Sequence, residues 1–206
     1  MTPTKINAEQ LLIHIIDDEE SVRTSCEFLL SSLGLLSQTW PSAVAFLASV
    51  DIYHPAVILS DLRLPEMTGQ ALLIHLIKHQ SPMALIALTG NGDISDAVTM
   101  LKEGAADYLE KPISSRRLQE AIARAQQLTI KRAEHYYIRN LYAQLTEKEK
   151  QVASELMAGN LNKIIADHLD VSVRTVEVHR SQVMKKMKAQ HISELIQRLA
   201  VLEHIL

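Results

Sequence analysis

The sequence predicts an α/β domain with a five-stranded, parallel, doubly wound sheet, followed by a smaller all-α domain. Up to about residue 114, short apolar runs alternate strictly with segments of helical apolar spacing. From about residue 143 onward the spacing is helical only. Hydrophobic residues make up 47% of the 206 residues, which is enough for a core in each domain. Strict strand–helix alternation favours a parallel sheet with helices on both faces.

The elements of the first domain follow from apolar runs and from residues that stop or cap helices. The run at 56–60, between Pro55 and Pro65, is apolar almost throughout, which is typical of a strand buried on both faces. Gly34 is expected to end the first helix, and Asp93 to cap the fourth. Strands are expected at 11–16, 35–40, 56–60, 83–88 and 106–109, and helices at 21–33, 41–50, 70–80, 93–103 and from about 114.

Polar residues gather where these strands end. Asp17 and Asp18 follow the first strand, Asp61 the third, Thr89 the fourth and Lys111 the fifth. In open parallel sheets the ligand site forms at the carboxyl ends of the strands. Converging carboxylates favour a hard cation such as Mg²⁺, held by two carboxylates, a backbone carbonyl and water. Asp61 could then form an acyl phosphate, with Lys111 and Thr89 holding the phosphoryl oxygens.

Each of these residues also has an ordinary structural explanation. Asp61 could shape a turn, Asp17 and Asp18 could cap a helix, Thr89 could be a turn hydroxyl and Lys111 a solvated charge. Their joint placement at strand ends favours the chemical interpretation.

Five separated motifs, in order, resemble the receiver domain of two-component response regulators over about residues 10–128. They are Asp17-Asp18, residues 60–65, Gly69, residues 88–93 and residues 104–112. The resemblance implies a flavodoxin-like fold and phosphorylation of Asp61 by a sensor histidine kinase. It implies Mg²⁺ ligation by Asp18, Asp61 and the Arg63 carbonyl, with Asp17 acting mainly through metal-bound water. It also implies a cis Lys111-Pro112 peptide and a switch pair, Thr89 and Tyr108.

The helical signal continues from about 114 to 142, so residues 129–142 are expected to form a helical linker. Thr146 and Glu149 then have the spacing of a capping box, opening a helix that Gly159 stops. A short helix at 162–168 precedes a helix capped by Ser172 that runs to about 187. Two helices joined by a tight turn predict a helix-turn-helix, which an amphipathic helix at 192–202 closes.

The second of these helices is basic, with five Lys or Arg residues and one acid over positions 174–188. Val176, Val183 and Met187 are expected to be buried. On the opposite face Glu177, Val178, Ser181 and Gln182 could meet base edges. The bases expected to neutralise phosphates are Arg174, Arg180, Lys185, Lys186 and Lys188. The alternative is a solvated basic face on a small helical bundle.

Residues 145–149, 159–166, 173–180 and 185–187 resemble the LuxR-type DNA-binding domain, over about residues 143–204. The order of the parts is similar to the FixJ/NarL class of transcriptional regulators. The resemblance implies a receiver at 1–128, a linker at 129–142 and a DNA-binding domain at 143–206. The DNA contacts expected in this domain are Arg174, Thr175, Glu177, Val178, Arg180, Ser181, Gln182, Lys185 and Lys186.

The expected function is that of a response regulator in a phosphorelay, which dimerises on phosphorylation and binds promoter DNA to act on RNA polymerase. We expect a cytoplasmic protein without membrane spans and without enzymatic turnover beyond slow autodephosphorylation. One alternative is a Mg²⁺-dependent phosphohydrolase that uses Asp61. Phosphatases of the haloacid dehalogenase type carry a second Asp two residues after the nucleophile, where this chain has Arg63. The other is a phosphorylation-independent binding module, with a receiver that is never phosphorylated and a helix-turn-helix used for protein contacts. The acidic pair Asp17 and Asp18, together with Thr89 and Lys111, argues against it.

Overall fold

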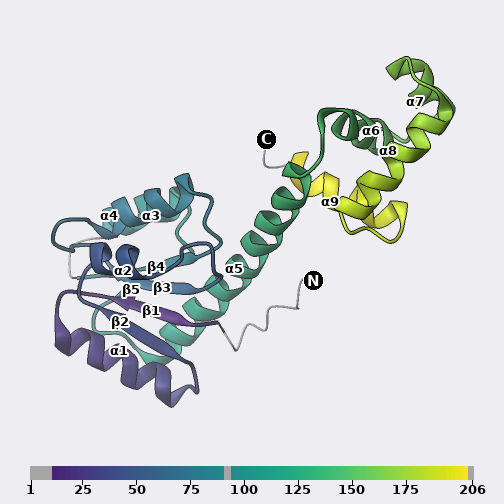
Figure 1. Ribbon diagram of the computed structural model, residues 1–206. Coiled ribbons are helices and arrows are strands. Elements are labelled where there is room, and N and C mark those ends of the chain that lie inside the picture. Colours follow the sequence, from purple (N-terminus) through teal and green to yellow (C-terminus); the bar gives the residue numbers. More distant parts are fainter. Residues whose placement is uncertain (1–10, 91–93, 204–206) are drawn as a thin grey trace. The chain divides into compact units, whose positions relative to one another are not determined.

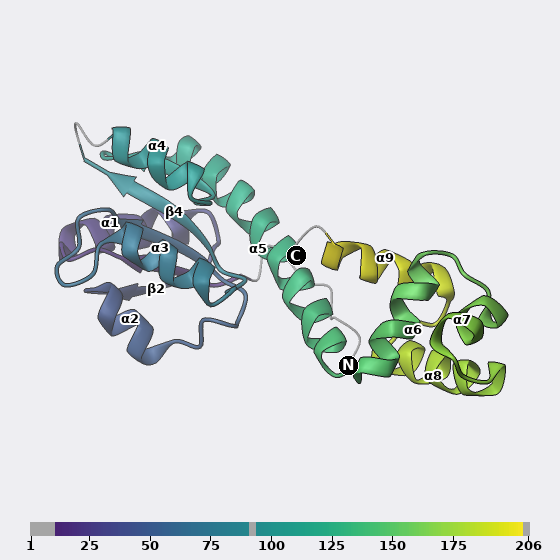
Figure 2. The same ribbon diagram turned by 90° about the horizontal axis from the view of Figure 1, so that it is seen from above.

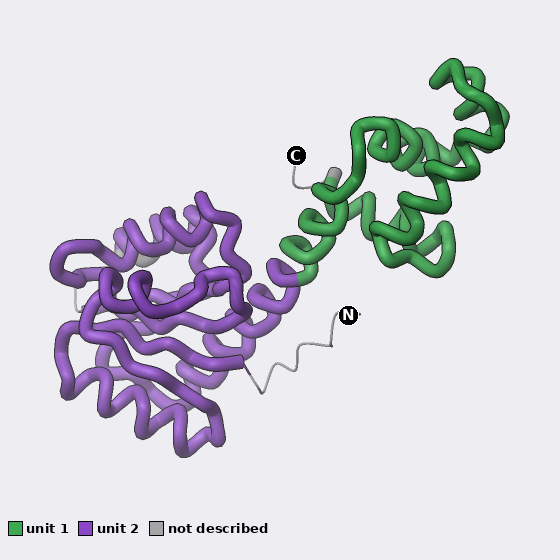
Figure 3. The backbone as a smooth tube through the Cα atoms, viewed as in Figure 1, with its two compact units in different colours: residues 1–3, 134–206 green, residues 4–133 purple. Residues whose placement is uncertain are grey.

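The computed structural model describes residues 11–90 and 94–203 (Figure 1). It divides into two compact units, whose described parts are residues 11–133 and 134–203 (Figure 3). The division falls inside one long helix. Asp93, the expected cap of the fourth helix, lies outside the described residues. The domain boundaries at 128 and 142 remain predictions.

The first unit contains a five-stranded sheet with all strands parallel, as predicted. The strand order is β2-β1-β3-β4-β5, which makes β1, β3 and β4 the interior strands. The side chains of β1 and β4 are buried throughout, and those of β3 up to its last residue, because helices cover both faces. The strands are β1 (Ile13–Ile16), β2 (Ser37–Trp40), β3 (Val57–Asp61), β4 (Ala84–Thr89) and β5 (Asp107–Glu110).

Helices cover both faces of this sheet (Figure 1 and Figure 2), and an apolar cluster of side chains lies on each face. On one face Phe46 and Leu72 pack against Ile58, and on the other Leu30 and Ile122 belong to the second cluster. The first face is covered by α2 (Ala43–Ser49), α3 (Gly69–Lys78) and α4 (Ile94–Lys102). The second is covered by α1 (Glu20–Ser32) and α5 (Ser115–Ala143).

Helix α5 is anchored in the first unit well beyond residue 128. The Thr129 hydroxyl donates to the Ala56 carbonyl at 3.1 Å and accepts from the Ala84 N–H at 3.2 Å. Arg132 donates to the carbonyls of Met83 and Gly104, at 3.0 and 2.9 Å. The first half of the predicted linker is therefore packed as part of the α/β unit.

The same helix then enters the core of the second unit, where Ile138 and Leu141 are buried. Their neighbours include Val152 on α6, Val176 on α8 and Leu195 on α9. Figure 2 shows these helices gathered in the second unit. Its elements after α5 are α6 (Glu147–Met157), α7 (Asn162–Leu169), α8 (Val173–Lys186) and α9 (Ile192–Glu203).

The predicted caps of the second unit form as expected. Thr146 and Glu149 make a complete capping box at the start of α6, and the Ser172 hydroxyl accepts from Thr175 N–H at the start of α8. The turn between α7 and α8 passes through Asp170, whose φ of 52° is in the left-handed region. The Val171 N–H closes it on the Ala166 carbonyl at 3.1 Å. The helix-turn-helix is therefore present.

Within the described ranges, none of the helices combines the length and apolar character needed to span a bilayer.

Candidate functional site

The first candidate site lies at the carboxyl edge of the sheet, and strand register assembles it. Strands β1 and β3 are neighbours, with Ile16 opposite Ser60. Because the strands are parallel, the following residues, Asp17 and Asp61, lie side by side at the carboxyl ends of β1 and β3. The Asp17 side chain is fully buried and that of Asp61 is 15% exposed.

Lys111 joins the two carboxylates. Its Nζ donates to Asp17 Oδ2 at 2.7 Å and also to Asp61 Oδ2. The Lys111 N–H donates to the Thr89 carbonyl at 2.8 Å, and the peptide between Lys111 and Pro112 is cis, as expected. A residue from the loop after β5 thus reaches the ends of β1 and β3, and Asp17, Asp61 and Lys111 form one cluster that does not include the Asp18 side chain.

Burial and ion pairing oppose one another in this cluster. Burial raises the pKa of Asp17, and the hydrogen bonds from Lys111 and from the Glu19 N–H only partly offset it. Burial acts to lower the pKa of Lys111, but its hydrogen bonds to Asp17 and Asp61 outweigh burial and raise it. The ammonium therefore stays charged between the two acids.

The backbone after Asp61 wraps closely around its carboxylate. The Arg63 N–H donates to Asp61 Oδ1 at 2.8 Å, so both carboxylate oxygens accept a hydrogen bond. Gly69 lies against the same segment, where a Cβ atom would stand 2.3 Å from the Asp61 carbonyl oxygen. Any larger residue at position 69 would push this loop away from the site.

The predicted metal ligands provide only oxygen donors, which suits Mg²⁺. Asp17 and Asp61 already share one cation, the Lys111 ammonium. Asp18 is exposed, and its carbonyl accepts from Arg23 at 3.0 Å. Among residues 11–90 and 94–203, no three His, Cys, Asp or Glu side chains form a metal-binding group. The oxygen donors of these residues suit a magnesium ion. The Lys111 ammonium neutralises Asp17 and Asp61 but does not contact the third acid, Asp18.

The predicted switch pair occupies β4 and β5. Thr89 is 1% exposed, and its hydroxyl donates to the Leu109 carbonyl at 3.4 Å. Tyr108 is half-buried and packs against the apolar cluster under α2, α3 and α4. Strand pairing places Tyr108 opposite Ala87, two residues before Thr89. Both side chains therefore lie on neighbouring strands that end at the acidic cluster.

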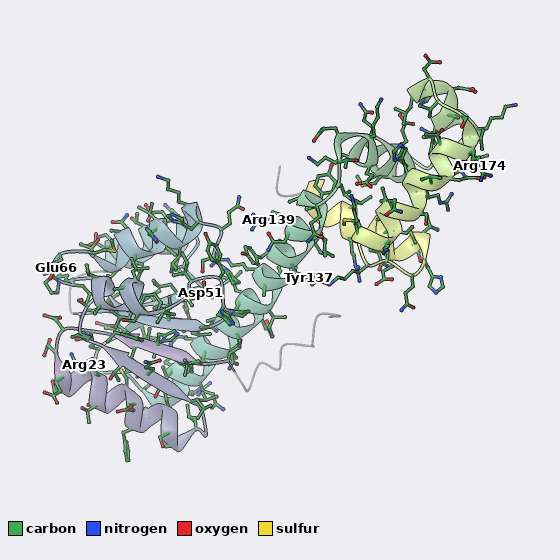
Figure 4. All side chains as sticks on the ribbon, viewed as in Figure 1. Arg23, Asp51, Glu66, Tyr137, Arg139 and Arg174 are labelled. Carbon is green, nitrogen blue, oxygen red and sulfur yellow. The ribbon has the colours of Figure 1, made fainter. Side chains whose placement is uncertain are left out.

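The second candidate site is the outer face of α8. Val176 and Val183 are buried, as predicted. Val178, predicted to meet base edges, is 55% exposed. Arg174, labelled in Figure 4, lies on the same helix. The exposed members of the predicted DNA-contact set are Arg174, Glu177, Val178, Ser181, Gln182 and Lys185.

The other three members of that set make contacts inside the second unit. The Thr175 hydroxyl lies 2.8 Å from that of Ser172. Arg180 donates to Asn162 Oδ1 at 3.0 Å, and Lys186 donates to Glu149 Oε2 at 2.6 Å. Lys188, the remaining predicted phosphate contact, has its Nζ 5.4 Å from the centre of the Tyr137 ring.

Sequence reasoning missed the residues that hold the predicted ones. Arg23, labelled in Figure 4, donates to the Asp17 carbonyl at 2.7 Å and supports the acidic loop. Asn162 and Glu149 bind basic side chains of α8. The spacing of Thr146 and Glu149 reveals the cap, but the contact between Glu149 and Lys186 depends on how α6 packs on α8. No local pattern could indicate it.

Comparisons with known families match both parts of the chain. Residues 13–123 match the response regulator receiver domain. Residues 143–199 match the bacterial regulatory proteins of the luxR family.

Similar proteins share this arrangement over nearly their whole length. The tetrathionate response regulatory protein TtrR of Salmonella typhimurium is 41% identical, covering 90% of each chain. The transcriptional regulatory protein FixJ of Rhizobium meliloti is 42% identical, covering 89% of this chain and 92% of FixJ. Among solved structures, the response regulator StyR aligns with a TM-score of 0.65 at 30% identity, covering 93% of this chain and 98% of StyR. Full-length FixJ from B. japonicum aligns with a TM-score of 0.54 at 37% identity, covering 94% and 97%.

Proposed function

Because the chain belongs to the two-component response regulators of the NarL/FixJ type, we propose that phosphorylation of Asp61 controls its binding to DNA. The family makes it a transcription regulator with a receiver and a LuxR-type DNA-binding domain. The observation that carries the proposal is the cluster of Asp17, Asp61 and Lys111 at the carboxyl edge of the sheet. An acid, its charge partner and a surrounding backbone are already assembled there.

In the proposed reaction the Asp61 carboxylate attacks the phosphorus of a phosphohistidine on a sensor histidine kinase. A carboxylate O–P bond forms, the P–N bond breaks, and the leaving imidazole takes up a proton. Lys111 holds a phosphoryl oxygen with its ammonium, and the Thr89 hydroxyl turns from Leu109 to hold another. The chain is the acceptor of the group and performs no turnover beyond slow loss of phosphate.

Asp17, Asp18, Asp61 and the Arg63 carbonyl would hold Mg²⁺. The ion, when bound, neutralises the negative charge that gathers on the phosphoryl oxygens. Asp17 is the fixed member of this set, because it is buried and Arg23 and the Glu19 N–H hold its position. Asp18 is the solvent-facing member.

A mostly apolar pocket of about 500 Å³ lies beside Lys111, which supports a protein as the phosphoryl donor. It is lined by residues of α1, among them Val22, Cys26 and Leu29, and by Pro112 and Ile113 of the loop before α5. An apolar pocket next to the acceptor suits a partner's apolar side chains better than a small polar phosphate ester.

We infer that the output is a dimer on promoter DNA that acts on RNA polymerase. Movement of Thr89 and Tyr108 would reshape the face formed by α4 and β5 and pair two receivers. Two copies of α8 would then reach two half-sites, which raises affinity above that of one small module. The cytoplasm, where kinase and DNA are both accessible, is the proposed location.

Substitution of Asp61 tests the proposal. Acetyl phosphate and Mg²⁺ should phosphorylate and dimerise the unsubstituted chain, as measured by intact mass and by light scattering after gel filtration. Asp61→Asn should show neither change, whereas Asp51→Asn, at an exposed acid that pairs with His54 and not with Lys111, should behave like the unsubstituted chain. Dimerisation of the Asp61→Asn chain in response to acetyl phosphate would contradict the proposal.

The same samples test the phosphohydrolase alternative. Position 63, where that class has a second acid, carries the exposed Arg63. Repeated release of phosphate from p-nitrophenyl phosphate, lost in Asp61→Asn, would favour the alternative. We expect no such turnover.

A further inference from the structure

In the second unit, an ion pair between Lys186 and Glu149 connects the end of α8 to the start of α6. Lys186 lies in the last turn of α8, and Glu149 in the first turn of α6. The Lys186 Nζ donates to Glu149 Oε2 at 2.6 Å. The same oxygen accepts from the Thr146 N–H at 2.7 Å, so one carboxylate caps α6 and holds α8.

This carboxylate is unusual among the acids of the unit because it is 5% exposed. The Lys186 side chain is 29% exposed, whereas the neighbouring Lys185 is classed as exposed. The end of α8 is fixed a second time by Arg198, which donates to the Met187 carbonyl. The last turn of α8 is therefore tied to α6 and to α9.

We propose that Glu149 is a positioning residue for DNA recognition by α8, and that Lys186 acts through this pair and not by neutralising a DNA phosphate. This inference rests on the proposed function as a DNA-binding regulator. It divides adjacent lysines into two roles: Lys185 meets the phosphate backbone, and Lys186 sets where the helix lies.

If Lys186 contacted a DNA phosphate, it would have to exchange the Glu149 carboxylate for the phosphate as its partner. If Lys186 moved to a phosphate, it would leave behind a buried carboxylate without its cation, and removing one partner of such a pair is strongly destabilising. A phosphate contact on the surface is screened by salt and offers less. The lowered pKa of Glu149, caused first by its hydrogen bond with Lys186, agrees with a carboxylate that stays charged in the pair.

The two roles differ in salt dependence. A lysine that neutralises a phosphate releases about one counterion. The slope of log K against log salt is negative, and loss of such a lysine makes it shallower by about 0.9. A positioning residue changes affinity and leaves the slope as it was. We therefore measure binding of the full chain, treated with acetyl phosphate and Mg²⁺, to a fluorescein-labelled duplex of random sequence over a salt series.

Lys185→Met should make the salt dependence shallower by about one unit of slope. Lys186→Met should weaken binding about tenfold with an unchanged slope, and Lys186→Arg, which keeps the cation and its donors, should restore binding. A slope for Lys186→Met that becomes as shallow as that of Lys185→Met would overturn the inference.

Glu149→Gln gives a test of opposite sign. If Glu149 merely withheld Lys186 from DNA, this substitution would release the lysine, tighten binding and steepen the slope. We expect binding weakened threefold to tenfold with the slope unchanged. Glu147→Gln is the matched control, because Glu147 lies on the same helix turn, is 85% exposed and is lost with the same change in charge.

Thermal unfolding separates these effects from loss of fold. Each variant is compared at a temperature where circular dichroism shows it fully folded. If Lys186→Met does not fold, Glu149→Gln, which keeps a cap acceptor, decides the matter. Tighter binding by Glu149→Gln than by Glu147→Gln would overturn the inference. If the unsubstituted chain bound no DNA at all, the proposed function itself would fail.

Discussion

At the scale of single residues, Thr129 shows how much one hydroxyl can hold. It is fully buried and bonds the chain just before β3 and at the start of β4. In the sequence, Thr129 is the first residue after the expected end of the receiver at 128, and it is expected to belong to the linker. Its partners lie 73 and 45 residues away, so no local pattern could identify them.

We predict that Thr129→Val lowers the free energy of unfolding of the first unit by about 1–3 kcal/mol. The valine fits the space but leaves the Ala56 carbonyl without this partner, and the cost is that of an unmade buried hydrogen bond. Urea denaturation measures it. Thr99→Val, at an exposed position on α4, should change stability by less than about 0.5 kcal/mol, and equal effects at both sites would contradict the argument.

A second buried polar pair makes the first unit sensitive to acid. The indole N–H of Trp40 donates to His14 Nδ1 at 3.0 Å, which requires a neutral imidazole. His14 is 3% exposed, and burial lowers its pKa to about 4. In the unfolded chain the pKa is the ordinary 6.5, so the unfolded state takes up the proton first as the pH falls.

The stability that His14 contributes is thus present above pH 6.5 and is lost as the pH falls toward 4. Because the pKa falls from 6.5 to about 4 on folding, the full loss is about 3 kcal/mol. We predict that His14→Gln, which keeps a side-chain acceptor for Trp40, removes this component of the pH dependence. Urea midpoints at pH 7.5 and pH 4.5 should converge in the variant relative to the unsubstituted chain. An identical pH dependence of both would exclude the assignment.

At the scale of elements, what the sequence could predict depended on whether the signal was local. The capping box of α6 and the Ser172 cap of α8 were predicted and are confirmed, because each cap involves residues within four positions of one another in the sequence. Element ends were less accurate: β2 begins at Ser37, two residues later than expected, and Leu36 is 67% exposed. The apolar pattern marks which residues are hydrophobic but not where backbone pairing stops.

We predict that Thr146→Ala lowers the stability of the second unit by about 0.5–2 kcal/mol, because the Glu149 N–H loses its cap acceptor. Thr146→Ser keeps the hydroxyl and should stay close to the unsubstituted chain. Thermal unfolding by circular dichroism compares them. A serine variant as unstable as the alanine variant would mean that the methyl group, and not the cap, is responsible.

At the scale of the whole molecule, the two units have separate cores. The clusters around Phe46 and Leu30 belong to the α/β unit, and that around Val176 to the helical unit. The alternation of strands and helices predicted this division, and the acids and lysine at strand ends were predicted with it. How the chain passes from one core to the other was not predictable, because a continuous helical signal does not say which residues each core takes.

We predict two separable unfolding transitions. Trp40, the only tryptophan, lies in the α/β unit, so its fluorescence should follow that unit alone, whereas far-ultraviolet circular dichroism should follow both. Thr129→Val should shift the fluorescence transition, and Thr146→Ala should leave it in place. A fluorescence midpoint that moves with Thr146→Ala would show that the units unfold together.

Helix α5 limits how this protein can be recombined with its relatives. Arg132 and Ala133 are still held in the α/β unit, and Tyr137 already packs in the helical one. A hybrid that keeps this chain through residue 133 therefore retains the contacts of Thr129 and Arg132 in the α/β unit. A junction at residue 123, the end of the receiver match, would discard Thr129 and Arg132. The receiver of such a hybrid would be less stable, whichever DNA-binding domain is attached.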